Sequence, residues 1–216
     1  MSKISKVIIF DLDGTLLDTS QGIFGSVRFA VGKMGLSPVD ESILPQFLGP
    51  PPKEIYKKIF GLTDKEALRA VSFHREYGIT KAIYEATVYE GIVKTLIAIR
   101  KSGYKLAVAT LKKQSIAEII LKNFELLQYF DSVVGMNDDE TLSKKDTIHL
   151  VMKYTASSEA IMVGDSSYDY IGSKEAGVGF IGVLYGFGFE QKGNYEFTTA
   201  RSPSEILDVI EGLCKI

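Results

Sequence analysis

The sequence predicts an α/β protein in which a doubly wound parallel sheet carries a small helical domain, inserted after the first strand. Two observations predict this class. Short apolar runs of the kind that form buried parallel strands alternate with amphipathic helical stretches. Roughly 95 residues separate the first run from the second, against the ~30 that a strand–helix–strand unit needs, and the excess is helical in pattern.

Five core strands are expected, and their apolar runs are nearly continuous, as in strands buried on both faces. They lie at residues 7–10, 105–109, 132–134, 160–163 and 180–184. Helical patterns fall between them, at 92–101, 116–121 and 147–152. The first of these ends at Gly103, which suits a left-handed helix cap. Together these elements predict a Rossmann-like core formed by residues 1–17 and 85–216.

The inserted helical domain is expected over residues 18–84. Its first helix has apolar residues on one face, at Ile23, Val27, Ala30, Val31 and Met34. Thr63 and Glu66 have the spacing of a capping box, which predicts that another helix begins there. Residues 47–52 contain three prolines and are expected to form a stiff non-helical turn.

Composition excludes several classes of partner. The chain has 216 residues, 45% hydrophobic and 24% charged, with a net charge of −2. A clustered basic surface is not expected, so we predict neither a nucleic acid polymer nor an anionic membrane as partner. Asp11 interrupts the first apolar run after four residues, which is too short for a secretory or membrane-spanning segment. The single cysteine, Cys214, has no partner for a disulfide and is expected to be inert. We expect a soluble, cytoplasmic protein of undetermined oligomeric state.

Polar residues follow several of the expected strands directly. Asp11 and Asp13 follow the first, Thr110 follows the second, and Asp165 with Asp169 follows the fourth. Two lysines, Lys144 and Lys145, lie in the expected loop after the third strand. Because ligands bind at the carboxyl ends of parallel strands, we expect these side chains to meet at one edge of the sheet.

Asp11 and Asp13 are two residues apart, so at a strand end their side chains point the same way. Carboxylates this close repel, and a hard divalent cation with oxygen ligands relieves that repulsion. Asp169 lies one helical turn after Asp165 and is expected to join them, although Asp165 alone is also explained as a helix cap. Mg2+ is therefore the expected cofactor.

Three weaker signals complete the expected site. Thr110 is expected near the start of a helix that begins close to Lys112, where a hydroxyl and backbone N–H groups bind phosphate. Lys144 or Lys145 would offset the negative charge of aspartates and phosphate. A second acidic group is more simply explained as a solvated loop; it comprises Asp138, Asp139 and Glu140.

Taken in order, these motifs resemble the haloacid dehalogenase superfamily of phosphatases. The resemblance rests on Asp11-Leu12-Asp13-Gly14-Thr15, Thr110 after a strand, a later lysine, and Gly164-Asp165 followed by Asp169. It covers the whole chain, since the helical insertion looks like that family's small cap domain. Residues 10–19 and 47–51 look most like the phosphoglycolate phosphatase branch.

The resemblance implies a role for each motif residue. Asp11 would be the nucleophile that forms an aspartyl phosphate, and Asp13 would be the general acid and then the general base. Mg2+ would be bound by Asp11, the backbone carbonyl of Asp13, and Asp165, with Asp169 as ligand or support. Thr110 and Lys144 would hold the phosphoryl group beside Gly14, with Lys145 as the alternative lysine; Lys144 fits the family's spacing better. An acid at position 13 favours phosphate chemistry over carbon–halogen cleavage.

Substrate selection is expected from the helical insertion, with candidate contacts at Gln21, Arg28, Lys53 and the turn at 49–52; His74 is expected to pack on a helix face. The expected substrate is a small phosphorylated metabolite, either phosphoglycolate-like or a 5′-nucleotide. A sugar phosphomutase remains an alternative, since it shares every core motif. A non-enzymatic module that is phosphorylated on aspartate is the third reading, although such a module needs neither the insertion nor Asp13.

Overall fold

The computed structural model describes residues 6–139 and 141–213. The chain divides into two compact units, one formed by Met1–Leu17 with Val88–Ile216 and the other by Asp18–Thr87. The first unit is an α/β sandwich and the second is helical. No helix among the described residues combines the length and the apolar character needed to cross a membrane.

The α/β unit is built on a six-stranded sheet in which all strands are parallel. The strand order is β5-β4-β1-β6-β7-β8, so the chain moves outward in one direction from β1 and then in the other. The strands are β1 (Lys6–Phe10), β4 (Lys105–Lys113), β5 (Ser132–Met136), β6 (Glu159–Gly164), β7 (Gly179–Val183) and β8 (Thr198–Ala200). This doubly wound order confirms the predicted fold class, and the reversal at β1 is where such sheets bind ligands.

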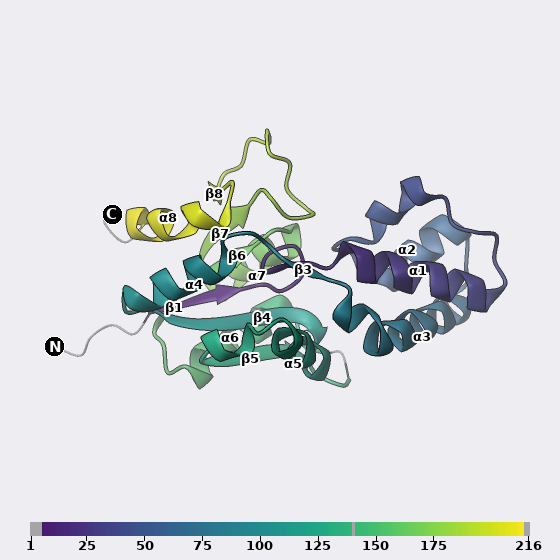
Figure 1. Ribbon diagram of the computed structural model, residues 1–216, viewed down its shortest axis with the longest axis horizontal. Coiled ribbons are helices and arrows are strands. Elements are labelled where there is room, and N and C mark those ends of the chain that lie inside the picture. The colour runs from purple at the N-terminus through teal and green to yellow at the C-terminus, as the bar shows by residue number, and fades with distance from the viewer. Residues whose placement is uncertain (1–5, 140, 214–216) are drawn as a thin grey trace. The chain divides into compact units, whose positions relative to one another are not determined.

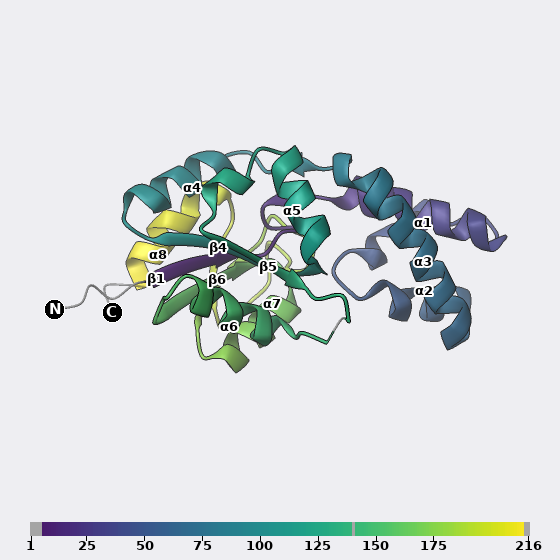
Figure 2. The ribbon, with the colours of Figure 1, turned by 90° about the horizontal axis from the view of Figure 1, so that it is seen from below.

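Helices cover both faces of the sheet, as Figure 2 shows. The helices α6 (Lys144–Tyr154) and α7 (Ser167–Ala176) pack on one face; α4 (Ile92–Lys101), α5 (Gln114–Asn123) and α8 (Ile206–Leu213) lie on the other. Alternate residues of β1 serve the two faces, because side chains in a strand alternate with a period of two. Val7 and Ile9 join the core beneath α6, together with Met162, Ile148 and Val151.

The helical unit contains α1 (Ser20–Met34), α2 (Pro52–Phe60) and α3 (Asp64–Thr80), with short 3-10 turns at Glu41–Phe47 and Ala82–Tyr84 (Figure 1). It has its own apolar core; this includes Val27, Ala30, Val31, Phe47, Tyr56, Ala67, Ala70 and Val71. The predicted capping box is confirmed, since Thr63 and Glu66 each accept a hydrogen bond from the other's backbone N–H. His74 packs against Tyr56 and lies 3.2 Å from its hydroxyl through Nδ1.

Two short strands lead out of and back into the α/β unit. These are β2 (Leu17–Asp18) and β3 (Thr87–Val88), which pair with each other in a two-stranded sheet. The boundaries between the two compact units fall inside these strands, after Leu17 and after Thr87.

Three local expectations differ from the structure. Strand β4 continues to Lys113 rather than ending at residue 109, because pairing resumes between Lys113 and Met136 after an irregularity. The Gln114 side chain holds this extension by donating from Nε2 to the Val133 carbonyl at 3.0 Å. Pro52 begins α2 instead of ending the turn, since the first position of a helix needs no N–H donor. The short edge strand β8 and helix α8 were not predicted.

Candidate active site

Asp11 lies at the point where the sheet reverses. Phe10 pairs with Val108 of β4 on one side and with Val163 of β6 on the other. The backbone N–H of Asp11 still donates to the Val163 carbonyl at 2.9 Å, so the position of Asp11 is set by the sheet itself. The ends of β4 and β6 therefore flank Asp11, as the strand-end argument predicts.

The loop after Asp11 is a tight turn that returns toward the sheet. Gly14 N–H donates to the Leu17 carbonyl at 2.8 Å, and Leu16 N–H donates to the Leu12 carbonyl at 3.0 Å. Gly14 has φ +75°, and a Cβ there would lie 2.2 Å from Asp165 Oδ2. Only glycine meets both requirements, so this turn brings backbone into direct contact with the second acidic motif.

Asp165 follows β6 directly and is fixed by the loop after β7. Its Oδ2 accepts from the backbone N–H of Phe187 at 2.6 Å, and Thr15 Oγ1 lies 3.4 Å from its Oδ1. The Tyr185 hydroxyl donates to the Thr15 carbonyl at 2.9 Å, which ties that loop to the turn after Asp11. Asp165 is thus positioned from three segments that are far apart in sequence.

Asp169 belongs to the N-terminal capping box of α7. Its Oδ2 accepts from the backbone N–H of Ser166 at 3.1 Å and from the Ser166 hydroxyl at 2.6 Å. The helix cap is therefore Ser166 and not Asp165. Asp165 therefore has no capping role, and the other oxygen of Asp169, Oδ1, contacts Lys144.

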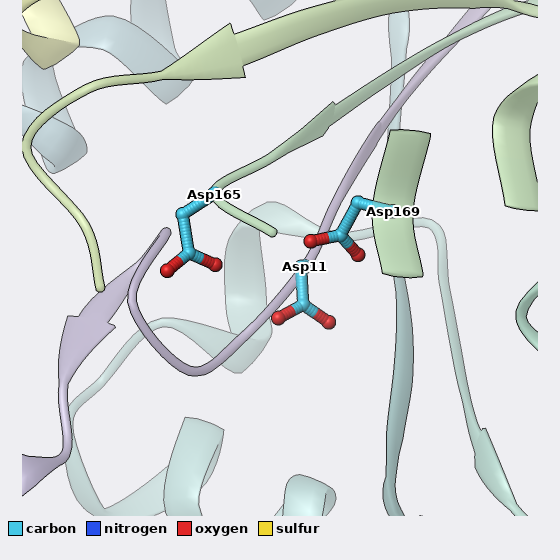
Figure 3. A group of neighbouring side chains, drawn as sticks. All are labelled: Asp11, Asp165 and Asp169. Carbon is cyan, nitrogen blue, oxygen red and sulfur yellow. The ribbon is translucent and has the colours of Figure 1, made fainter. Parts of the chain in front are cut away.

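The three buried carboxylates form one cluster (Figure 3). One oxygen from each of Asp11, Asp165 and Asp169 lies within 4.8 Å of the others. Asp11 directly follows β1, Asp165 directly follows β6 and Asp169 lies in the first turn of α7, and all three are buried. The predicted convergence of acids from both motifs is therefore present in the structure.

Lys144 neutralises part of this cluster. Its Nζ lies 2.6 Å from Asp11 Oδ1 and 2.6 Å from Asp169 Oδ1, and it donates to the Ala109 carbonyl at 2.8 Å. Lys144 is the first residue of α6, behind a capping box of Ser143 and Asp146, and not a loop residue as expected. Lys145 is half-buried, and its charge acts on Asp146 instead.

The electrostatics of the cluster follow from its burial. Burial, together with repulsion from Asp169 and Asp13, raises the pKa of Asp11 to about 7 despite the attraction of Lys144. Burial and the neighbouring acids Asp169 and Asp11 raise the pKa of Asp165 to about 8. Burial alone would lower the pKa of Lys144, but attraction to Asp11 and Asp169 outweighs it and raises the pKa. Lys144 therefore keeps its positive charge over the pH range in which Asp11 and Asp165 lose their protons.

This donor set fits a hard divalent cation. Carboxylate oxygens are the ligands that Mg2+ prefers, and the cluster holds three of them against one lysine. The raised pKa values of Asp11 and Asp165 mean that a nearby positive charge would be strongly favoured. Asp11 and Asp165, with Asp169 beside them, are the side chains able to hold such an ion.

Asp13 is not one of the three clustered carboxylates and pairs with Lys112. Lys112 Nζ lies 3.0 Å from Asp13 Oδ2, whereas Asp13 Oδ1 is a buried oxygen with no hydrogen-bond partner among the described residues. Thr110 is buried, and its Oγ1 accepts from the backbone N–H of Lys112 at 3.2 Å. Thr110 lies within β4 and not at a helix start, because α5 begins only at Gln114.

The candidates in the helical unit have other partners. Arg28 donates through Nε to Glu41 Oε1 at 2.9 Å, and Lys53 Nζ lies 3.5 Å from Asp64 Oδ1. Gln21 is exposed in the first turn of α1. Of the expected solvated loop, Asp138 and Asp139 are exposed, and Glu140 lies outside the described residues, as does Cys214.

Two features of the site were not found from sequence. The sequence assigns Lys112 only to the approximate start of a helix, and the irregular pairing between Ala109 and Lys113 leaves no regular strand alternation that would predict its contact with Asp13. The sequence does not predict that Tyr185 and the backbone N–H of Phe187 help to position Asp165, since the contact between this loop and a distant carboxylate depends on the tertiary structure. The Gly-x-Gly spacing of Gly186 and Gly188 was the available signal: a Cβ on Gly186 would lie 2.3 Å from the Asp165 Cβ.

The sequence and the fold of this chain are similar to those of known hydrolases. Residues 8–183 match the family described as haloacid dehalogenase-like hydrolase. A 5′-nucleotidase of Pseudomonas aeruginosa is 36% identical over 188 residues, covering 86% of this chain and 85% of that protein. A phosphoglycolate phosphatase of Agrobacterium fabrum is 32% identical, covering 85% and 82%. A haloacid dehalogenase-like hydrolase from Streptococcus pneumoniae superposes with a TM-score of 0.87 at 30% identity, covering 95% and 98%.

Proposed function

The chain belongs to the haloacid dehalogenase-like hydrolase family and is a phosphatase of that family, and we propose that it uses Mg2+ to hydrolyse a small phosphomonoester through an aspartyl phosphate on Asp11. The observation that carries the proposal is the buried cluster of Asp11, Asp165 and Asp169 around Lys144. Phosphoryl transfer depends mainly on positioning and charge neutralisation, and this cluster supplies both.

Asp11 is the nucleophile. Lys144 holds its Oδ1 at 2.6 Å, which orients the carboxylate and leaves Oδ2 for attack on phosphorus. A bond forms between Asp11 Oδ2 and phosphorus as the bond from phosphorus to the leaving oxygen breaks. Because Asp11 is fixed through its own backbone to β6, the attacking oxygen has little freedom to lose.

Asp13 is the general acid and base. It donates a proton to the leaving oxygen in the first step and removes a proton from the attacking water in the second, which releases phosphate and restores Asp11. Its position two residues after Asp11 places it beside the same phosphoryl group. Its carboxylate is partly exposed, at 24% of the side chain, and its Oδ2 pairs with Lys112.

Mg2+ would be held by Asp11, the backbone carbonyl of Asp13 and Asp165. When bound, it would offset the negative charge of the phosphoryl group. Asp169 supports the site indirectly, because its two oxygens contact Ser166 and Lys144. Thr110 binds a phosphoryl oxygen by donating its hydroxyl proton, since Oγ1 already accepts from Lys112 N–H.

The substrate is a small phosphorylated metabolite, with phosphoglycolate and 5′-nucleotides as the classes to compare. We place part of the substrate selection in the helical unit, with Gln21, Arg28, Lys53 and the turn at 49–52 as the candidates. For Arg28 and Lys53 this requires exchange of their present partners Glu41 and Asp64 for substrate.

Phosphate release from a panel of small phosphomonoesters tests the proposal. We expect release that requires Mg2+, stops on chelation and returns when Mg2+ is restored. Asp11→Asn, which keeps the shape of the side chain, should lower the rate by at least about 1000-fold. Isomerised sugar phosphate without free phosphate would indicate a mutase, and stable phosphorylation without turnover would indicate a signalling module; either result would contradict the proposal.

A further inference from the structure

Lys112 is a second cation beside the reacting groups, paired with Asp13, whereas Lys144 is paired with Asp11 and Asp169. Lys112 Nζ lies 3.0 Å from Asp13 Oδ2, and its backbone N–H donates to Thr110 Oγ1 at 3.2 Å. One residue therefore contacts both the acid and the hydroxyl assigned to the phosphoryl group. Lys112 lies near the end of β4, just before the pairing of Lys113 with Met136 resumes.

The ammonium group of Lys112 retains capacity for a ligand. A lysine has three N–H donors, and Asp13 accepts from one of them. The Lys112 side chain is 23% exposed and that of Asp13 is 24% exposed, so the pair is partly desolvated yet open to solvent. Coulomb attraction for an arriving anion is stronger in such a place than at a fully solvated surface.

The position of Asp13 determines what reaches Lys112. To protonate the leaving oxygen, Asp13 must lie within about 3 Å of it. Lys112 contacts Asp13 directly, so its ammonium lies near the leaving group when Asp13 reaches the leaving oxygen. An anionic substituent a few bonds from the ester oxygen would come within reach of Nζ.

Charge balance points the same way. The site contains more negative than positive side chains. Its two ammonium groups belong to Lys112 and Lys144, and its four carboxylates belong to Asp11, Asp13, Asp165 and Asp169. A divalent cation held by Asp11 and Asp165 would offset the charge of that cluster, whereas Lys112 pairs with Asp13. Among the described residues, Lys112 is therefore the cation that we assign to balance negative charge on the leaving group.

We propose that Lys112 is a specificity residue that binds an anionic group on the leaving-group side of the substrate. The preferred substrates then carry a carboxylate or a second phosphate close to the scissile oxygen, as phosphoglycolate and pyrophosphate do. A 5′-nucleotide, whose leaving group is a neutral ribose hydroxyl, does not use this contact. The inference rests on the proposed phosphatase function and narrows its substrate class.

Matched substrate pairs test the inference. Phosphoglycolate is compared with 2-hydroxyethyl phosphate, which replaces the carboxylate with a neutral group of similar size, and pyrophosphate is compared with methyl phosphate. We expect wild-type kcat/KM to favour the anionic member of at least one pair. Lys112→Met should reduce that preference by about tenfold or more, mainly through KM, because a charge-assisted contact in the bound state is lost. Lys112→Arg should restore part of it.

Lys113→Met is the matched control. Lys113 is the next residue of the same strand, and its Nζ lies 3.8 Å from Asp138, whose side chain is fully exposed. The preference for anionic leaving groups should survive this substitution. Equal losses in Lys112→Met for the charged and neutral members of every pair would overturn the inference, since they would assign Lys112 only to the support of Asp13.

Binding measurements keep this result separate from the phosphatase assay. Each phosphate compound is titrated calorimetrically into Asp11→Asn, with Lys112 either intact or replaced by Met. The difference in affinity measures what the Lys112 contact contributes to binding in the absence of turnover. We expect weaker binding of the anionic member alone when Lys112 is replaced. Unchanged binding would overturn the role of Lys112 even if phosphate release succeeds, and selective weakening would support it even if phosphate release fails.

Discussion

The acidic cluster of the α/β unit and the Arg28–Glu41 ion pair of the helical unit have opposite surroundings. In the α/β unit, the side chains of Lys144, Asp11 and Asp169 are 5%, 12% and 2% exposed, and each contacts residues distant in sequence. In the helical unit, the Arg28–Glu41 pair is 44% and 69% exposed. Burial of several charges at once therefore distinguishes a reactive site from solvated ion pairs, because burying a charge is costly unless it is paired.

The largest expected difference between the two regions is the response to loss of the cation. Lys144→Met leaves Asp11 and Asp169 buried without their positive partner. We expect a loss of phosphatase rate of about 1000-fold and a loss of unfolding free energy of about 3 kcal/mol. Rates with Mg2+ and urea unfolding curves measure both.

Arg28→Met is the control for that substitution, because it removes a cation from an exposed pair. We expect no clear change in Tm or in the urea midpoint, since exposed ion pairs contribute little. Equal destabilisation by Lys144→Met and Arg28→Met would contradict the claim that the buried and the exposed ion pairs contribute differently to stability.

The second prediction concerns pH in the α/β unit. Asp11 and Asp165 have pKa values of about 7 and about 8 when folded, against 3.8 for an ordinary carboxyl group. The folded, metal-free state therefore binds more protons than the unfolded state over that window, and its stability falls as pH rises through the folded pKa values. Mg2+ needs the deprotonated carboxylates, so its binding strengthens over the same window.

Thermal unfolding with and without Mg2+ measures this effect. We expect the gain in Tm on adding Mg2+ to grow from about pH 6 to about pH 9, with an apparent affinity that rises about 100-fold. Asp165→Asn should remove most of the dependence. A gain in Tm that is constant across this range would show that Mg2+ does not bind these two carboxylates.

The smallest predicted effect concerns the loop that positions Asp165. Tyr185→Phe removes only the hydroxyl that donates to the Thr15 carbonyl at 2.9 Å, so the turn after Asp11 loses one tie. We expect Mg2+ affinity to weaken about tenfold, as for other groups that orient metal ligands. Calorimetry measures this, with Tyr154→Phe, an exposed tyrosine at the end of α6, as the control. Equal affinities in the two variants would remove Tyr185 from the site.

Much of the α/β unit could be predicted because parallel strands carry a local signal. The apolar runs located β1, β4, β5, β6 and β7, and the acids at their ends identified the edge at which Asp11 and Asp165 meet. The family resemblance read from these motifs is confirmed by the match over residues 8–183. Strand β8 is only three residues long and lies at the sheet edge, so it has too short a run to detect.

Contacts between residues that are distant in sequence were harder to predict. Whether Lys144 or Lys145 faces Asp11 depends on where α6 begins, which the Ser143 capping box sets. The end of β4 depends on Gln114 reaching across to β5, so the position of Lys112 beside Asp13 could not be read from its neighbours. The partners of Arg28 and Lys53, Glu41 and Asp64, lie on other segments of the helical unit.

The most direct measurement is the site of phosphorylation during turnover. Acid quenching of the reaction, followed by peptide mapping in a mass spectrometer, locates a phosphoryl group that is stable at low pH. Asp13→Asn, which lacks the base for the second step, should accumulate it. The account predicts phosphate on Asp11, dependent on Mg2+ and absent in Asp11→Asn. Phosphate on a different residue, or hydrolysis that persists in Asp11→Asn, would contradict it.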